Sequence, residues 1–87
     1  MKAHTLSVLV ENKAGALSRV TGLFTRRGIN IENLSVVPCE NPDMSRITIV
    51  VLGDDIQVGP VMRHLTRLIE VITVSDLTDN EQVEHEL

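Results

Sequence analysis

Leu6–Ile31 reads LSVLVENKAGALSRVTGLFTRRGINI, and its apolar period changes twice. Up to Val10 every second residue is apolar, which is the pattern of a strand with one buried face. From Ala16 onward, apolar residues recur at three- and four-residue steps, which indicates an amphipathic helix. Gly28 suits the left-handed position after the last turn of that helix, and an extended pattern resumes at Ile29. The stretch therefore predicts a strand, a glycine-bearing loop, a helix and a second strand.

The loop at residues 11–15 is the main chemical feature of this stretch. A helix that begins after such a loop presents backbone N–H groups that lack acceptors, and these groups can bind a carboxylate. The ordinary alternative is that Asn12 only turns the chain and that Gly15 only permits a positive φ. The local pattern by itself favours this ordinary alternative.

The rest of the chain repeats the alternation of strand and helix. Pro38 ends the second strand because it has no N–H for the sheet, and the β-branched run at 47–51 predicts a central strand. Pro60 is expected in the first turn of the second helix, with regular helix from about Val58 onward. The buried stripe of this helix is predicted to comprise Val58, Val61, Met62, Leu65, Leu68 and Ile69. The expected strands are 4–10, 29–37, 45–52 and 70–77, and the expected helices are 16–27 and 57–69.

This order of elements predicts an α+β fold, the ferredoxin-like βαββαβ sandwich. With right-handed crossovers, the strands form an antiparallel four-stranded sheet in the order 4-1-3-2, with both helices on one face. The second strand then lies at an edge, with Ile29 and Ile31 expected on one face and Leu34 and Val36 on the other. An apolar edge is poorly suited to water, so we expect a homodimer in which two copies of this strand pair.

Composition excludes several classes of function. The 87 residues suffice for one domain, which we expect over 1–78, followed by an acidic tail or the start of a linker over 79–87. The net charge of −4 gives no basic face for nucleic acid, and no apolar run approaches the ~18 residues that span a membrane. Cys39 has no second cysteine to pair with, and the three histidines show no ligand spacing with it. No metal site is predicted, and a cytoplasmic location is expected.

Three runs of sequence resemble a known family. Residues 6–20, 23–34 and 45–51 resemble the N-terminal ACT domain of the acetohydroxyacid synthase (acetolactate synthase) small, regulatory subunit. The motif Gly28-Ile29-Asn30-Ile31-Glu32, together with Ser45-Arg46, is the part that is specific to this subunit. Many members of the family continue into a second domain, so the chain corresponds either to a short form or to an N-terminal fragment.

The resemblance implies a non-catalytic partner of the catalytic large subunit, in the synthesis of valine, leucine and isoleucine. Thiamine diphosphate, Mg and FAD are then expected only in that large subunit, and no cofactor in this chain. The small subunit is expected to activate the enzyme and to confer feedback inhibition by a branched-chain amino acid, with valine as the first choice. In the family this effector lies between two ACT domains of a dimer. Matched residue by residue, the site comprises Asn12, Ala14, Gly15, Ala16 and Leu17 of one protomer with Asn30 and Ile31 of the other.

Other functions found on this fold suit the sequence less well. An acylphosphatase needs an arginine in the first loop to hold phosphoryl oxygens, and residues 11–15 offer only Lys13. An RNA-binding sheet needs aromatic residues on its middle strands, whereas Phe24, the one aromatic residue, lies in a predicted helix. A metal carrier would need paired cysteines. The remaining alternative is a freestanding ACT-domain sensor that binds another amino acid and regulates a different enzyme.

Overall fold

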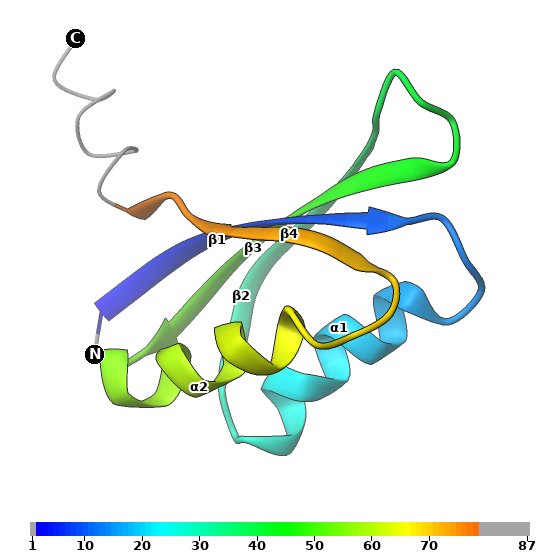
Figure 1. Cartoon of the computed structure of the whole chain (residues 1–87). Helices are drawn as coiled ribbons and strands as arrows, with labels where there is room; N and C mark the ends of the chain where they lie inside the picture. The colour runs from blue at the N-terminus through cyan, green and yellow to red at the C-terminus, as the bar shows by residue number, and fades with distance from the viewer. Residues whose placement is uncertain (1, 79–87) are drawn as a thin grey trace, which may run out of the picture.

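A computed structural model describes residues 2–78 of the chain (Figure 1). Its elements are β1 Lys2–Glu11, α1 Ala16–Arg26, β2 Asn30–Pro38, β3 Met44–Gly53, α2 Asp55–Leu65 and β4 Val71–Asp76. The strands form one antiparallel sheet in the order β2-β3-β1-β4, and both helices lie on the same face of it. The predicted ferredoxin-like fold and strand order are therefore confirmed. The predicted tail, residues 79–87, lies outside the described residues.

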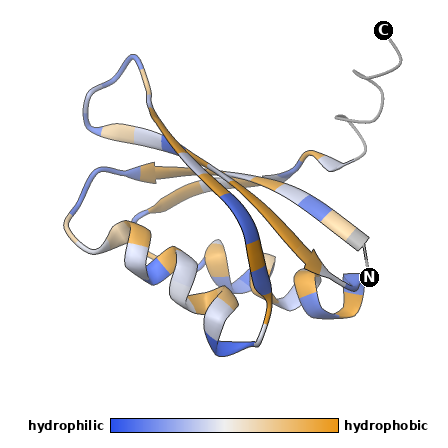
Figure 2. Ribbon diagram, turned by 180° about the vertical axis from the view of Figure 1, so that it is seen from behind, coloured by the Kyte–Doolittle hydropathy of each residue, from blue (hydrophilic) through white to orange (hydrophobic). Residues whose placement is uncertain are grey.

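The hydrophobic core lies between the sheet and the two helices. In the pairing of β1 with β3, Leu6 lies opposite Ile49 and Val8 lies opposite Ile47. Directly opposed residues share a face, and all four of these side chains are buried. Figure 2 shows apolar and polar residues alternating around α1, as expected for a helix with one face in the core. The core comprises Leu6, Val8, Val10, Val20, Phe24, Ile29, Ile47, Ile49, Val51, Val58, Val61 and Leu65.

Helix α1 is bounded by two glycines in the left-handed conformation. Gly15 precedes the helix with a φ of 82°, and Gly28 follows it with a φ of 72°. The Ile29 N–H donates to the Phe24 carbonyl, and the Gly28 N–H donates to the Thr25 carbonyl, each at 3.0 Å. These two bonds form a Schellman motif, which satisfies carbonyls at the helix end. The conformation predicted for Gly28 is confirmed.

Helix α2 begins and ends earlier than predicted, at 55 and 65 rather than 57 and 69. It begins early because the Asp54 N–H donates to the Gln57 side-chain oxygen at 3.0 Å, which is half of a capping box. After the helix the chain enters a tighter turn, in which the Leu68 N–H donates to the Leu65 carbonyl at 3.1 Å. Such a turn has ~3.0 residues per turn instead of ~3.6, so side chains leave the helical stripe. Ile69, which was predicted to be buried, is 85% exposed.

Pro60 lies inside α2 and not in its first turn, so that prediction is wrong. Because proline has no N–H, the Ile56 carbonyl one turn earlier lacks its helical donor. Ile56 is 86% exposed, so water can hydrate that carbonyl. The helix therefore tolerates the proline at this half-buried position.

Strand β2 contains a bulge that changes which residues share a face. Ile31 lies opposite Val51 and Leu34 lies opposite Ile49, so Glu32 is an extra residue between two paired segments. Val51 and Ile49 both face the helices, which places Ile31 and Leu34 on the same face of the sheet. The prediction that they lie on opposite faces is wrong, because a period of two holds only without a bulge.

The outer side of β2 is an apolar edge. Leu34, Val36 and Val37 on this strand are 39%, 46% and 54% exposed. The edge position and the apolar character were both predicted, and the pairing of two such strands in a dimer stays a prediction. Within residues 2–78, no helix has the length and apolar character needed to cross a membrane.

Candidate functional site

An open cavity of about 300 Å³ lies where β1 ends and α1 begins. Its walls are formed by Val10, Glu11, Asn12, Lys13, Ala16, Leu17, Val36, Ser45 and Ile47. Asn12, Ala16 and Leu17 belong to the predicted site, and Ala14 and Gly15 lie in the loop between them. Three of the five residues on the first predicted side of the site therefore line one cavity.

Asn12 joins the loop after β1 to the loop before β3. Its Nδ2 donates to the Pro42 carbonyl at 2.9 Å, and its Oδ1 accepts from the Ser45 hydroxyl at 2.5 Å. Its backbone N–H donates to the Asp43 carbonyl at 2.7 Å. A side-chain amide offers two donor and two acceptor positions, so one of each remains. Asn12 thus holds the cavity wall in place and can still bind a ligand.

The start of α1 has backbone donors that no described residue accepts from. The Ala16 N–H donates to the Lys13 carbonyl at 3.1 Å. The N–H groups of Leu17 and Ser18 have no acceptor among residues 2–78. The first turn holds no acidic residue, and no side chain among residues 2–78 caps it. This end of the helix therefore carries a partial positive charge that the described chain leaves without a counter-charge.

The Arg19 side chain contacts the loop before α1, at Ala14 and Gly15. Its guanidinium donates to the Ala14 carbonyl at 3.2 Å and forms an ion pair with Glu70, just before β4. The hydrogen bond from Arg19 is the main reason why the pKa of Glu70 is lowered from its ordinary value. A Cβ at Gly15 would lie 3.1 Å from Arg19 Nη1. Gly15 is thus favoured both by its positive φ and by this close approach.

Asn30 and Ile31, the second predicted side of the site, lie away from the cavity in the same protomer. Val36 in the cavity wall pairs with Ile47, whereas Asn30 pairs with Leu52. Five residues along β3 separate these pairs, which corresponds to ~17 Å. Asn30 is exposed and Ile31 is half-buried. One chain therefore does not bring the two predicted sides together.

Six residues that line the cavity were not among the predicted site residues, namely Val10, Glu11, Lys13, Val36, Ser45 and Ile47. Ser45 is a buried polar residue on the helix-facing side of β3, where the next inward residues, Ile47 and Ile49, are apolar. A polar residue at an inward position of a strand whose other inward residues are apolar could have indicated that Ser45 belongs to a site. Val36 could not be placed on the correct face, because the bulge at Glu32 is not visible in the apolar pattern.

The described part of the chain contains no group of three His, Cys, Asp or Glu residues that could hold a metal ion. Cys39 is free and half-buried, in the loop after β2.

Comparison with known protein families and sequences gives consistent matches. The profile of the AHAS small subunit-like ACT domain matches residues 6–73. The chain is 57% identical over 84 residues to a probable acetolactate synthase small subunit from Archaeoglobus fulgidus, covering 97% of this chain and 52% of that protein. It is 48% identical over 82 residues to the acetolactate synthase isozyme 3 small subunit of Escherichia coli K12, covering 94% and 50%. The chain thus spans about half the length of these curated relatives.

Solved structures share the fold. The crystal structure of the acetolactate synthase small subunit from Thermotoga maritima superposes with a TM-score of 0.78 at 38% identity, covering 87% of this chain and 47% of that chain. The ACT domain of a GTP pyrophosphokinase from Chlorobium tepidum has a TM-score of 0.73 at 17% identity, covering 86% of this chain and 96% of that chain, and shows the fold alone. The family resemblance inferred from the sequence is confirmed.

Proposed function

Because the chain belongs to the family of AHAS small subunit-like ACT domains, we propose that it regulates an acetolactate synthase. In this proposal it binds a branched-chain amino acid, with valine as the first candidate, and so confers feedback inhibition on a catalytic large subunit that it also activates. The observation that carries the proposal is the cavity of about 300 Å³ beside the uncapped start of α1.

The chemistry of the cavity suits a small aliphatic amino acid. The carboxylate can accept hydrogen bonds from the N–H groups of Leu17 and Ser18, next to the positive end of the helix dipole. The free acceptor position of Asn12 can receive an N–H of the ligand ammonium. The side chain can pack on the apolar part of the wall, where Val36 and Ile47 lie.

The proposal includes a dimer, because Asn30 and Ile31 reach this cavity only from a second chain. If two copies of β2 pair antiparallel about a two-fold axis near Leu34, Asn30 of one chain lies beside the Pro38 end of the other. That end follows Val36, which lines the cavity. The exposed apolar side chains of β2 favour such pairing, since each chain covers the other's edge.

Calorimetric titration with valine, leucine and isoleucine in turn tests the binding step. We expect saturable binding of at least one of them, and Val36→Asp should abolish it because it places a charge on the apolar wall. Ile69→Asp is the matched control, since Ile69 is exposed and lies outside the cavity. Binding of none of the three would contradict the proposal, whereas binding of an unrelated amino acid would favour the freestanding sensor.

Reconstitution with the catalytic large subunit tests the regulatory step. We expect the chain to raise the rate of acetolactate formation and to make that rate sensitive to the amino acid that binds. A chain that binds the amino acid but leaves the rate of the large subunit unchanged would contradict the regulatory part alone.

A further inference from the structure

The side chain of Arg19 occupies a carbonyl that the start of α1 would otherwise use. In a regular α-helix each N–H donates to the carbonyl four residues earlier, so the acceptor expected for the Ser18 N–H is the Ala14 carbonyl. That carbonyl accepts instead from the Arg19 guanidinium at 3.2 Å. The regular helical bonds begin at the Arg19 N–H, which donates to the Gly15 carbonyl at 3.0 Å. The Ser18 N–H is therefore left without an acceptor among residues 2–78.

The backbone at Gly15 could adopt a closed alternative. Its φ of 82° lies in the left-handed region, whereas a residue inside an α-helix has a φ of about −63°. A helical φ at Gly15 would extend α1 by one residue and bring the Ala14 carbonyl to the Ser18 N–H. Glycine adopts both conformations readily, so the backbone alone does not exclude this closed start. The contact from Arg19 to Ala14 is what favours the open start.

Glu70 holds the Arg19 guanidinium in this position. Its carboxylate forms an ion pair with Arg19, and its side chain is only 13% exposed. Its backbone carbonyl accepts from the Glu11 N–H at 2.8 Å, so Glu70 is itself fixed to the end of β1. Neither Arg19 nor Glu70 lines the cavity beside α1. Both residues can therefore affect a ligand in that cavity only through the loop and the start of α1.

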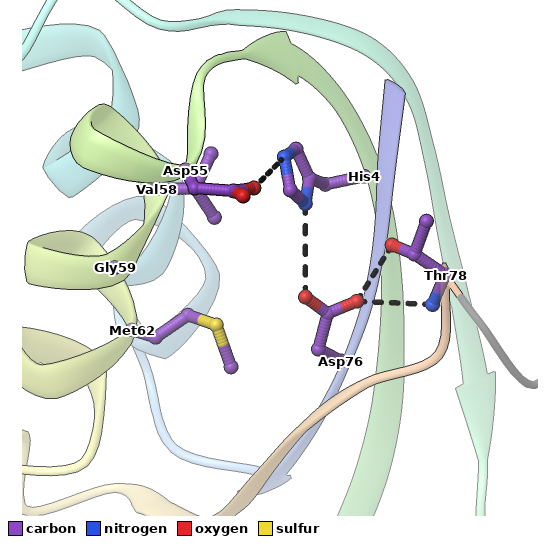
Figure 3. A pocket seen from close by; sticks show the side chains of 7 residues that line it. All are labelled: His4, Asp55, Val58, Gly59, Met62, Asp76 and Thr78. Carbon is purple, nitrogen blue, oxygen red and sulfur yellow. Dashed lines mark hydrogen bonds and ion pairs between the residues drawn. The ribbon is translucent and has the colours of Figure 1, made fainter. Parts of the chain in front are cut away.

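The start of α2 shows that an open helix start is not general in this fold. There the Asp54 N–H donates to the Gln57 side chain, and Asp55 adds a negative charge to the first turn. Figure 3 shows this end of α2 beside a second cavity, where the carboxylates of Asp55 and Asp76 lie next to the ring of His4. Two carboxylates repel the carboxylate of an amino acid. Of the two helix starts, only that of α1 suits this group.

We propose that Arg19 and Glu70 are positioning residues for the effector site, and that they keep the start of α1 open by withholding the Ala14 carbonyl from the Ser18 N–H. The inference rests on the proposed function, in which the carboxylate of an amino acid accepts from the N–H groups of Leu17 and Ser18. With the carbonyl withheld, the Ser18 N–H binds the carboxylate without breaking an internal bond. Without Arg19, the ligand competes with the bond between Ser18 and Ala14.

Hydrogen exchange of the Ser18 amide, measured without ligand, tests the first step. Arg19→Met removes the guanidinium and keeps an unbranched side chain. We expect the Ser18 amide to exchange about fivefold more slowly, because it gains the Ala14 carbonyl as an acceptor. A merely structural role for Arg19 predicts the opposite, since the loss of a stabilising contact speeds exchange. Arg26→Met is the matched control, because Arg26 Nε donates to the Gly22 carbonyl at 3.3 Å at the other end of the same helix. Unchanged or faster Ser18 exchange in Arg19→Met would overturn the inference.

A Glu70 variant separates hydrogen bonding from charge. Loss of the positive charge of Arg19 could by itself slow base-catalysed exchange nearby. Glu70→Ala changes the local charge in the opposite direction and releases the Arg19 guanidinium, so we expect slower Ser18 exchange here as well. Faster exchange in Glu70→Ala would show an effect of charge alone and would overturn the inference.

Calorimetry with valine tests the consequence for the ligand. We expect Arg19→Met to weaken valine binding about tenfold, the usual effect of losing one charge-assisted hydrogen bond, and Arg26→Met to leave it unchanged. Arg19→Lys keeps a donor for the Ala14 carbonyl and a charge for Glu70, so it should restore most of the affinity.

The two measurements distinguish failure of this inference from failure of the proposed function. Wild-type affinity for valine in Arg19→Met would overturn the inference and leave the proposed function intact. If the wild-type chain binds none of the branched-chain amino acids, the proposed function fails, and slower Ser18 exchange in Arg19→Met still shows that Arg19 withholds the carbonyl.

Discussion

At the scale of single residues, position 15 allows backbone strain to be separated from ligand binding. A residue with a Cβ would have to adopt a φ of 82° at this position, and its Cβ would lie 3.1 Å from Arg19 Nη1. Gly15→Ala and Gly15→Asp share the strain, which costs about 1–2 kcal/mol, but only aspartate adds a negative charge at the uncapped helix start. We expect comparable losses of unfolding free energy in denaturant titrations, and loss of valine binding by calorimetry only in Gly15→Asp. Unchanged valine binding in Gly15→Asp would contradict the site.

The ion pair between Glu70 and Arg19 should make the stability of the fold depend on pH in the acid range. The Arg19 hydrogen bond lowers the pKa of Glu70 from 4.5, so this carboxylate stabilises the fold above its unfolded pKa and loses that contribution as pH falls through the folded pKa. Burial raises the pKa of Asp76, but hydrogen bonds from Thr78 and the neighbouring His4 together outweigh burial, so the pKa of Asp76 is lowered from its ordinary value of 3.8. The stability that Asp76 contributes is therefore also lost at acid pH. We expect Glu70→Gln to reduce the fall in melting temperature between about pH 5 and pH 3. Glu40→Gln, on an exposed loop, should not, and identical pH profiles for wild type and Glu70→Gln would contradict this link.

The two left-handed glycines were predictable from the sequence, whereas the long-range side-chain contacts around the cavity were not. Gly28 follows the last turn of an amphipathic stripe, and that local position alone implies a positive φ. The contact between Arg19 and Glu70 joins residues 51 positions apart, and the hydrogen bond between Ser45 and Asn12 joins residues 33 positions apart. No local pattern encodes such pairs, because they arise only when the sheet and the helices pack.

At the scale of secondary-structure elements, the apolar edge of β2 leads to a prediction about assembly. Leu34→Lys and Val36→Lys each place a charge on this edge, and we expect monomers because lysines oppose edge pairing. Ile69→Lys is the control, since Ile69 is more exposed but lies in the turn before β4. Sedimentation at micromolar concentration measures the mass. A monomeric wild-type chain under these conditions would rule out the proposed dimer.

Helix α2 allows a prediction about stability. Pro60 lies in the helix interior, where a proline costs up to about 3 kcal/mol relative to alanine. Pro60→Ala restores a donor for the Ile56 carbonyl, so we expect the free energy of unfolding to rise by about 1–3 kcal/mol in denaturant titrations. Gly59→Ala in the same helix should also raise the free energy of unfolding, by a smaller amount of about 1 kcal/mol. A less stable Pro60→Ala variant would show that the proline ring contributes packing that outweighs the lost hydrogen bond.

Apolar periodicity gave the existence and type of all six elements but not the local irregularities. The alternation in β1 led to its correct buried face, and the continuous β-branched run led to the correct central position of β3, because both strands pair on two sides. The bulge at Glu32 and the early end of α2 at Leu65 arise from backbone hydrogen bonding that apolar patterns do not record. The predicted faces of β2 and the predicted burial of Ile69 were wrong for this reason.

At the scale of the whole molecule, the sheet order determines what one chain can and cannot bring together. β3 lies between β1 and β2, and β2 runs antiparallel to it, so Asn30 lies far along the sheet from the end of β1. The proposed dimer restores proximity, because pairing about a two-fold axis reverses the direction of the second β2. Binding is then linked to dimerisation, and valine should tighten the dimer by the same factor by which dimerisation tightens valine binding.

Mixed dimers test whether the two sides of one site come from different chains. Gly15→Asp chains and Asn30→Ala chains should each fail to bind valine as homodimers, because every site lacks one side. In the heterodimer, one cavity joins the mutant loop to the mutant β2, and the other joins a wild-type loop to a wild-type β2. Calorimetry should therefore recover half of the binding sites per heterodimer. If a verified heterodimer recovers none, each site lies within a single chain, and Asn30 acts on it only indirectly.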